Sequence, residues 1–139
     1  MSDFDATDPG SYRFWAAEHV RFADLDMLGH VNNKAYAIYY ETARVSFMSA
    51  CNLSDGAKVG MAMVRLEIDY RKEIRFPAEL KLGVRLLRLG TSSLTLACGI
   101  FDGATCSSTS QSIAVRFNAE TRASKPFTQE ERQALEAYL

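Results

Sequence analysis

Apolar and charged residues alternate most regularly between Val64 and Phe76. A period of two is typical of a strand that packs one face on a core and exposes the other face to water. Only Lys72 interrupts the apolar side of this predicted strand. The alternation resumes at Leu80 and slips at Leu87-Arg88-Leu89, which predicts a second strand containing a bulge.

Three further stretches have the pattern of strands. They run from Phe14 to Phe22, from Leu94 to Ile100 and from Ser107 to Phe117. In the last of them we expect Ile113, Val115 and Phe117 to face the core. Turn-forming residues separate the later strands at residues 76–79 and 90–92 and at Asp102-Gly103, where the Asp-Gly pair is a strong hairpin signal. Strands joined by short turns predict an antiparallel sheet.

A helical pattern extends from Asn33 to Cys51. Its apolar residues recur at intervals of four, three, four and four, which places them on one face. They are Tyr36, Tyr40, Ala43, Phe47 and Cys51. Ile38, Tyr39, Val45 and Met48 widen this surface, so we expect the helix to be covered on several sides. Turn formers at 51–56 end the helix, and Thr128 to Glu131 forms a capping box before a short terminal helix.

The order of elements predicts an α+β fold with a five-stranded antiparallel sheet wrapped around one long central helix, followed by a short C-terminal helix. Residues 1–139 form a single domain in this interpretation, and residues 1–11 are expected to be a flexible tail. The outer strands are left as edges, so we expect pairing with a second copy of the chain.

Composition and charge narrow the possible functions. The chain has 139 residues, 47% of them hydrophobic and 24% charged, which suits one globular domain. A net charge of −1 gives no overall attraction to nucleic acid or to anionic membranes. No apolar run reaches membrane-spanning length, and the start lacks the pattern of a signal peptide. Cys51, Cys98 and Cys106 match no zinc pattern, so we expect reduced thiols in a cytoplasmic protein.

The loop from Ala23 to Asn32 and the first helical residue hold an unusual number of polar groups. Helix capping and turn formation alone explain one or two of them. A functional alternative uses the helix start, whose unpaired N–H groups and positive dipole end can polarise an ester or thioester carbonyl. Asp26 precedes the helix closely enough to attack that carbonyl or to deprotonate a water molecule.

The run from Asp24 to Arg44 reads D-x-D-x-x-G-H-V-N-N-x-x-Y-x-x-Y-x-E-x-A-R. It resembles the signature of hot-dog fold acyl-CoA thioesterases of the 4-hydroxybenzoyl-CoA thioesterase (YbgC-like) family, and the order of elements extends the resemblance from about Tyr12 to Phe117. The resemblance implies hydrolysis of an acyl-CoA thioester to a carboxylic acid and CoA, without a metal or organic cofactor. It also implies a homodimer or homotetramer with the active site at the dimer interface.

The same resemblance implies roles for single residues. Asp26 is the catalytic carboxylate, as nucleophile or general base, and the backbone N–H of Asn33 polarises the carbonyl. His30 hydrogen-bonds within the site or orients water, while Asp24 shapes the loop. The expected substrate contacts are Gly29, Val31, Tyr36, Arg88 and Ser93, the last two beside the turn where related enzymes hold the pantetheine and nucleotide.

Several alternatives stay open at this point. Plant acyl-ACP thioesterases carry a similar segment, but Leu28 stands where they have Asn. A hot-dog protein that binds acyl-CoA or lipid without turnover is a further alternative, and a hot-dog dehydratase fits the spacing less well. Glu41 and Arg44 lie three residues apart and can form an ion pair that braces a sheet edge or dimer contact. The other interpretation makes Glu41 a second catalytic carboxylate.

Overall fold

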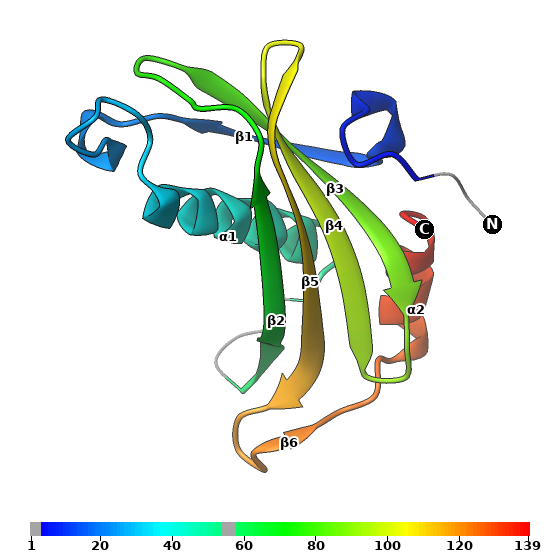
Figure 1. Ribbon diagram of the computed structural model, residues 1–139. Helices are drawn as coiled ribbons and strands as arrows, with labels where there is room; N and C mark the ends of the chain where they lie inside the picture. The colour runs from blue at the N-terminus through cyan, green and yellow to red at the C-terminus, as the bar shows by residue number, and fades with distance from the viewer. Residues whose placement is uncertain (1–3, 54–57) are drawn as a thin grey trace.

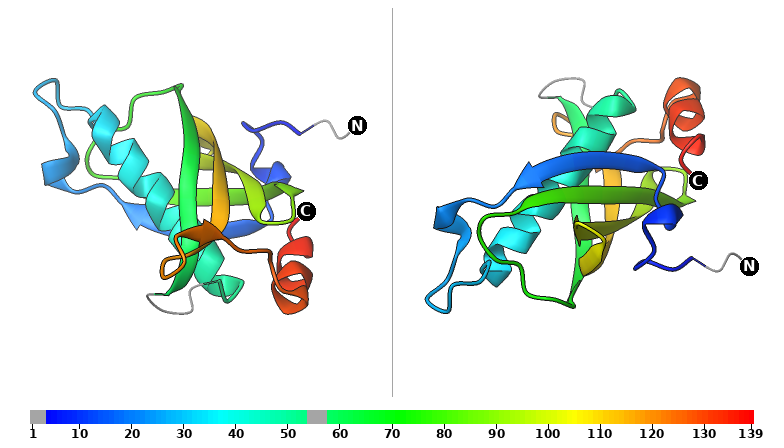
Figure 2. Two further views of the ribbon diagram at one scale, coloured as in Figure 1. Left: turned by 90° about the horizontal axis from the view of Figure 1, so that it is seen from below. Right: turned by 90° about the horizontal axis from the view of Figure 1, so that it is seen from above.

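A curved antiparallel sheet wraps around one long helix in the computed structural model, which describes residues 4–53 and 58–139 (Figure 1). Figure 2 shows this arrangement from below and from above. The main elements are β1 (Phe14–His19), α1 (Asn33–Ala50), β2 (Val59–Tyr70), β3 (Glu79–Leu89), β4 (Ser93–Asp102), β5 (Thr105–Asn118) and α2 (Gln129–Glu136). Two 3-10 helices, η1 (Pro9–Ser11) and η2 (Phe22–Asp24), and the two-residue strand β6 (Ala123–Ser124) complete the described chain. The predicted α+β architecture is confirmed.

The strands follow the order β1-β3-β4-β5-β2, and β6 pairs with β5. All pairs are antiparallel, and β1 and β2 form the edges of the sheet in the described part of the chain. Two of the three predicted turns, at 90–92 and at Asp102-Gly103, connect neighbouring strands, and Gly103 adopts a φ of 61° in the β4–β5 turn. The turn predicted at 76–79 precedes β3, which is not a neighbour of β2 in the sheet. The predicted bulge is confirmed by a register shift between Leu86 and Arg88.

Two predicted strands end earlier than the alternation suggested. The strand predicted to reach Phe22 ends at His19, because Phe22–Asp24 turns into a 3-10 helix. The strand predicted from Val64 to Phe76 instead spans Val59–Tyr70. The alternation predicted too long a strand because Ile74 fits the apolar side of the pattern. Ile74 is fully buried, but it lies in the β2–β3 loop. Val64 lies at a second register shift and is 62% exposed.

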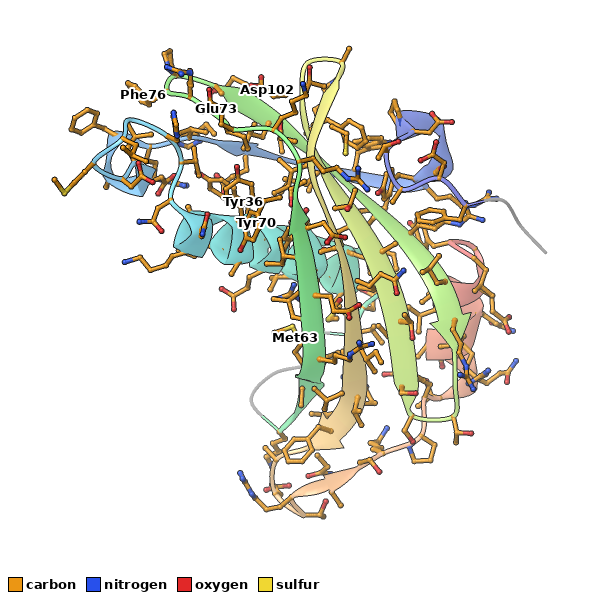
Figure 3. All side chains as sticks on the ribbon, in the orientation of Figure 1. Tyr36, Met63, Tyr70, Glu73, Phe76 and Asp102 are labelled. Carbon is orange, nitrogen blue, oxygen red and sulfur yellow. The ribbon has the colours of Figure 1, made fainter. Side chains whose placement is uncertain are left out.

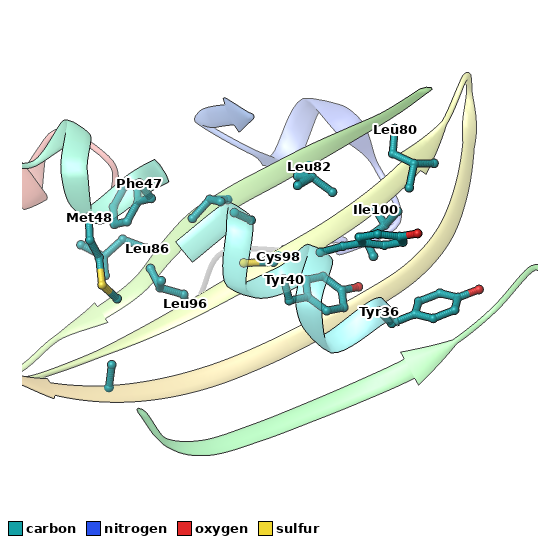
Figure 4. Packing of buried hydrophobic residues seen from close by; sticks show 14 of the residues in the cluster. Tyr36, Tyr40, Phe47, Met48, Leu80, Leu82, Leu86, Leu96, Cys98 and Ile100 are labelled. Carbon is teal, nitrogen blue, oxygen red and sulfur yellow. The ribbon is translucent and has the colours of Figure 1, made fainter. Parts of the chain in front are cut away.

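Helix α1 buries the predicted apolar stripe against the sheet (Figure 4). The expectation that the helix is covered on several sides is wrong for a single chain, since Ile38 and Val45 are 55% and 57% exposed. Tyr39 and Met48 are buried as predicted. The helix lies closest to β1 and β3, which leaves the side near β2 open.

The prediction that Ile113, Val115 and Phe117 face the core from β5 is also wrong. The residues that face α1 are small or polar, and all are buried: Ser108, Ser110, Ser112, Ala114 and Arg116. Pairing with β4 sets this parity, because Leu96 lies opposite Ser112 and paired side chains share a face. Ile113, Val115 and Phe117 therefore lie half-buried on the outer face.

Hydrogen bonds offset part of the cost of burying these polar side chains of β5. The Tyr40 hydroxyl donates to Ser108 Oγ at 2.7 Å, and Ser108 Oγ donates to the Asp69 carbonyl at 2.8 Å. Buried polar groups are tolerated when such partners are present. The bonds link α1 to β5 and β5 to β2.

Helix α2 closes one end of the core. The predicted capping box is present: Thr128 Oγ1 accepts from the Glu131 amide at 3.1 Å, and Glu131 Oε1 accepts from the Thr128 amide at 2.9 Å. Glu131 Oε2 also forms an ion pair with Nη2 of the fully buried Arg116, at 2.5 Å. Leu135 inserts its side chain into the core.

The segment predicted as a flexible tail makes specific contacts in its described part. The Tyr12 hydroxyl donates to the Ala6 carbonyl at 2.6 Å, and the rings of Phe4 and Tyr12 meet edge to face. The Tyr12 ring lies over Gly83 and Gly99, where a Cβ atom would clash with it. Residues 1–3 of this tail, and residues 54–56 of the predicted helix-ending turn, lie outside the described residues. Within residues 4–53 and 58–139, no helix is long and apolar enough to cross a membrane.

Candidate active site

The loop between β1 and α1 contains a tight hairpin. Leu25 and Val31 form an isolated antiparallel bridge, and the Asp26 amide donates to the His30 carbonyl at 2.9 Å. Gly29 closes the turn with its amide on the Asp26 carbonyl and adopts a φ of 82°. This left-handed conformation costs glycine little, whereas a side chain would be strained. Gly29 is therefore explained first by the turn.

Asp24 ties this loop to the helix. Its Oδ2 accepts from the Tyr39 hydroxyl at 2.6 Å and from the Arg21 amide at 3.0 Å. Its backbone carbonyl accepts from the Asn32 amide at 2.8 Å. These contacts support the loop-shaping role expected for Asp24.

Asp26 is exposed and is held through one oxygen only. Its Oδ1 accepts from the amides of Leu28 at 2.9 Å and His30 at 3.3 Å. Its Oδ2 has no hydrogen-bond partner in the described part of the chain. The carboxylate is thus oriented by the backbone and keeps one oxygen available to take a proton or to attack a carbon atom.

The start of α1, directly after this loop, supplies a hydrogen-bond donor. Asn32 caps the helix through Oδ1, which accepts from the Lys34 amide at 3.0 Å, and its carbonyl accepts from the Ala35 amide at 2.9 Å. The Asn33 amide has no partner within residues 4–53 and 58–139, and Asn33 is exposed. An unpaired N–H at the positive end of a helix suits a carbonyl oxygen that gains negative charge.

His30 contacts a residue that the sequence did not point to. Its Nε2 lies 2.7 Å from Glu73 Oε2, and Glu73 Oε1 accepts from Arg75 Nη2 at 2.9 Å. The backbones of His30 and Arg75 also form a bridge. Glu73 was hidden in the charged face of the predicted strand Val64 to Phe76, and the break at Lys72 was the only signal that this part is a loop. Figure 3 labels Glu73 in the β2–β3 loop.

Val31 and Tyr36 are buried beside the loop. The Val31 amide donates to the Ile74 carbonyl at 2.9 Å, which fixes Val31 in the core. Tyr36 is 3% exposed, and its ring meets the Tyr70 ring edge to face with centroids 4.9 Å apart (Figure 3). Burial raises the pKa of the Tyr36 hydroxyl, and the neighbouring Tyr70 and Glu73 add to this effect. Tyr36 therefore forms a neutral wall one helical turn from Asn33.

Arg88 and Ser93 do not join this group within one chain. They flank the β3–β4 turn, whereas the loop leaves β1 beside Glu79, at the opposite end of β3. Arg88 comes nine positions after Glu79 along β3, which corresponds to about 30 Å.

The expected ion pair between Glu41 and Arg44 is not formed in the described part of the chain. Glu41 is exposed, while Arg44 is only 8% exposed. Arg44 Nη1 is buried without a hydrogen-bond partner among the described residues. The pair therefore does not brace a single chain.

Residues 20–135 match the family described as Thioesterase-like superfamily. The uncharacterized protein YsmA of Bacillus subtilis is 36% identical over 87 residues, which cover 62% of this chain and 59% of that protein. The crystal structure of the PA5185 protein from Pseudomonas aeruginosa has a TM-score of 0.86 at 26% identity and covers 94% of both chains. A thioesterase superfamily structure from Jannaschia sp. CCS1 has a TM-score of 0.82 at 26% identity, covering 89% of this chain and 81% of its own. The similarity of the backbones confirms the predicted hot-dog fold.

Proposed function

The chain belongs to the thioesterase-like superfamily, and from this premise we propose that it is an acyl-CoA thioesterase of the 4-hydroxybenzoyl-CoA thioesterase type. Membership of the superfamily supports thioester hydrolysis as the class of reaction. The observation that carries the assignment to a site is that the loop before α1 and the helix start each present a group with no hydrogen-bond partner among residues 4–53 and 58–139. These groups are Oδ2 of Asp26 and the backbone amide of Asn33.

In the proposed reaction the thioester carbonyl oxygen accepts a hydrogen bond from the Asn33 amide, which makes the carbonyl carbon more electrophilic. Asp26 Oδ2 removes a proton from water as the water oxygen attacks that carbon. The C–S bond then breaks, the CoA sulfur takes up the proton, and the carboxylic acid is released. In the nucleophilic variant Asp26 itself attacks, CoA leaves, and water hydrolyses the resulting anhydride. His30, held by Glu73, orients the attacking water.

We place this site at an interface between two copies of the chain. The edge strand β2 and the exposed apolar residues Ile38, Val45 and Val64 support a contact on that side. Because Arg88 and Ser93 lie far from Asp26 in their own chain, a role in holding CoA requires them to come from the second copy. All three cysteines are free thiols, which favours a cytoplasmic location.

The direct test is release of free thiol from a panel of short, long and aromatic acyl-CoA esters. We expect Asp26→Asn to lower kcat/KM by about 10² to 10⁴, the range for loss of a general base. Asp102→Asn is the matched control, because Asp102 lies at the end of β4 outside the loop (Figure 3). Near-normal turnover by Asp26→Asn would refute the catalytic assignment. Tight acyl-CoA binding without thiol release by the wild type would identify a binding protein, and faster turnover of carrier-protein thioesters would identify a different substrate.

A further inference from the structure

A cavity of about 650 Å³ lies beside η1 on the outer face of the sheet, away from α1. Leu80 and Leu82 are buried in the core, so Lys81 between them points to the opposite face of β3. The candidate active site is separate, because its loop leaves the other end of β1 (Figure 1). We call this feature the outer-face cavity. Its walls are two alanines of β1 together with Pro9, Trp15, Lys81, Phe101 and Gly103.

Three aromatic rings hold two walls of the outer-face cavity in place. The Trp15 and Phe101 rings meet edge to face with centroids 5.6 Å apart, and each meets the Tyr12 ring at 5.8 Å. Tyr12 is itself fixed over Gly83 and Gly99, because only glycine leaves room for its ring at these positions. The cavity is therefore preformed, and a ligand does not have to order its walls.

The size and the lining of the outer-face cavity are those of a small-molecule site. Such sites have volumes of about 300 to 1,000 Å³ and are lined mainly by apolar and aromatic side chains. Phe101 is only 2% exposed, whereas Trp15 is 41% exposed and presents a large apolar surface. Two aromatic walls favour a flat, apolar ligand that packs against their faces or edges.

The side chains that line the cavity supply hydrogen-bond donors and no acceptors. Lys81 is exposed, and its ammonium has no partner in the described part of the chain, not even Glu79 two positions earlier. The indole N–H of Trp15 has no acceptor among residues 4–53 and 58–139. The other lining side chains are those of alanine, proline, phenylalanine and glycine, which contain no oxygen. A ligand that brings an acceptor with a negative charge complements this set.

We propose that the outer-face cavity binds a small aromatic carboxylate. Its ring packs against Trp15 and Phe101, and its carboxylate accepts a hydrogen bond from the Lys81 ammonium. The site lies outside the proposed site of hydrolysis, and binding there does not depend on that function. Because Lys81 is exposed, binding weakens as the ionic strength rises.

Trp15 is the only tryptophan in the chain, so its fluorescence reports on the cavity directly. The wild type is titrated with benzoate, with acetate, which lacks the ring, and with benzyl alcohol, which lacks the charge. We expect a saturable change with benzoate that weakens in high salt. The dissociation constants of acetate and benzyl alcohol should be at least about threefold higher.

Lys81→Met removes the charge and keeps an apolar side chain of similar length. We expect it to raise the dissociation constant of benzoate at least about threefold, as for loss of an exposed ion pair, and Lys81→Arg to retain most of the affinity. Lys58→Met is the control and should bind benzoate as the wild type does. Lys58 is an exposed lysine paired with Glu120, and it precedes β2 at the end of the sheet opposite the β4–β5 turn.

A wild-type fluorescence that benzoate leaves unchanged overturns the inference, and so does equal affinity in the wild type and Lys81→Met. The mass in solution is measured alongside. A lower mass in Trp15→Ala, without benzoate binding to the wild type, would assign the outer face to a contact between copies and also overturn the inference. Neither readout uses thioester turnover, so failure of the proposed function leaves this test intact.

Discussion

Asp24 and Asp26 lie two residues apart and have different surroundings. Asp24 accepts hydrogen bonds from the Tyr39 hydroxyl and the Arg21 amide through the same oxygen, so it joins the loop to α1. Within the described part of the chain, Asp26 is oriented by backbone amides alone and keeps one oxygen without a partner. In the proposed mechanism, mobility in the loop would misplace that oxygen relative to the Asn33 amide, so we expect Asp24 and Tyr39 to support the reaction by holding the loop in position.

Tyr39→Phe removes the hydroxyl that holds Asp24 and leaves the ring in the core. The Tyr39 side chain is fully buried, and burial together with the bond to Asp24 raises the pKa of its hydroxyl, which therefore stays protonated and donates. We expect the free energy of unfolding to fall by about 1.5 to 3 kcal/mol, as for a hydrogen bond to a charged group. Urea denaturation measures it. Tyr70→Phe is the control, since Tyr70 is half-exposed and its hydroxyl has no partner among residues 4–53 and 58–139; equal losses in both variants would contradict this role.

Among the residues of the site, the sequence indicated the loop and its candidates but not their contacts. The resemblance selected Asp26, and its catalytic role stays a prediction; the structure adds that two backbone amides orient its Oδ1. Glu73 was missed because its partner His30 lies 43 residues earlier in the chain, and no local pattern connects the two. Contacts between distant loops depend on how the sheet curves, which periodicity does not encode.

Elements were predictable where one local rule dominated. The helix from Asn33 and the capping box at Thr128 follow from spacing and caps, and both are confirmed. The inner face of β5 was mispredicted because its register with β4 places serines inward and Ile113 outward. A hydrophobic pattern predicts the inward face only when the inward residues are apolar, and here Ser108 is stabilised by Tyr40.

The contribution of Glu131 in helix α2 to the stability of the protein should depend on pH. Burial alone would raise the pKa of Glu131, but the Thr128 amide and the Arg116 guanidinium outweigh it and lower that pKa below the ordinary 4.5. A carboxylate with a lowered pKa in the folded state stabilises the protein above its unfolded pKa, and the stabilisation is lost as pH falls through the folded value. We expect Glu131→Gln to lower the free energy of unfolding by about 1 to 3 kcal/mol at pH 7, and by less near pH 3.

Denaturation of wild type and variant at both pH values measures this difference. Glu130→Gln is the control, because Glu130 is exposed in the same helical turn and should have little effect at either pH. A loss in Glu131→Gln that does not shrink at low pH would show that the helix depends on packing rather than on the charge of Glu131.

At the scale of the whole molecule, the hot-dog arrangement leaves one side of α1 uncovered. The sheet encloses the helix from β1 and β3, while a groove beside β2 and the apolar residues around it stay open. The sequence predicted a helix covered on several sides, and Ile38 and Val45 contradict this only for a single chain. The proposed second copy on the β2 side would reconcile the two observations, because it would bury these apolar residues.

Val64→Lys tests that assembly. Val64 lies at the bulge of the edge strand β2 and is 62% exposed, so a lysine there leaves the isolated chain intact. In a dimer that buries β2, the lysine must lose water or find a new partner, which we expect to raise the dissociation constant about tenfold or more. Sedimentation over a concentration series measures it. Leu139→Lys is the control, since Leu139 is also exposed but lies at the C-terminus beyond α2. If thioester turnover needs the second copy, activity falls with the mass; an unchanged mass in Val64→Lys would exclude this edge as the interface.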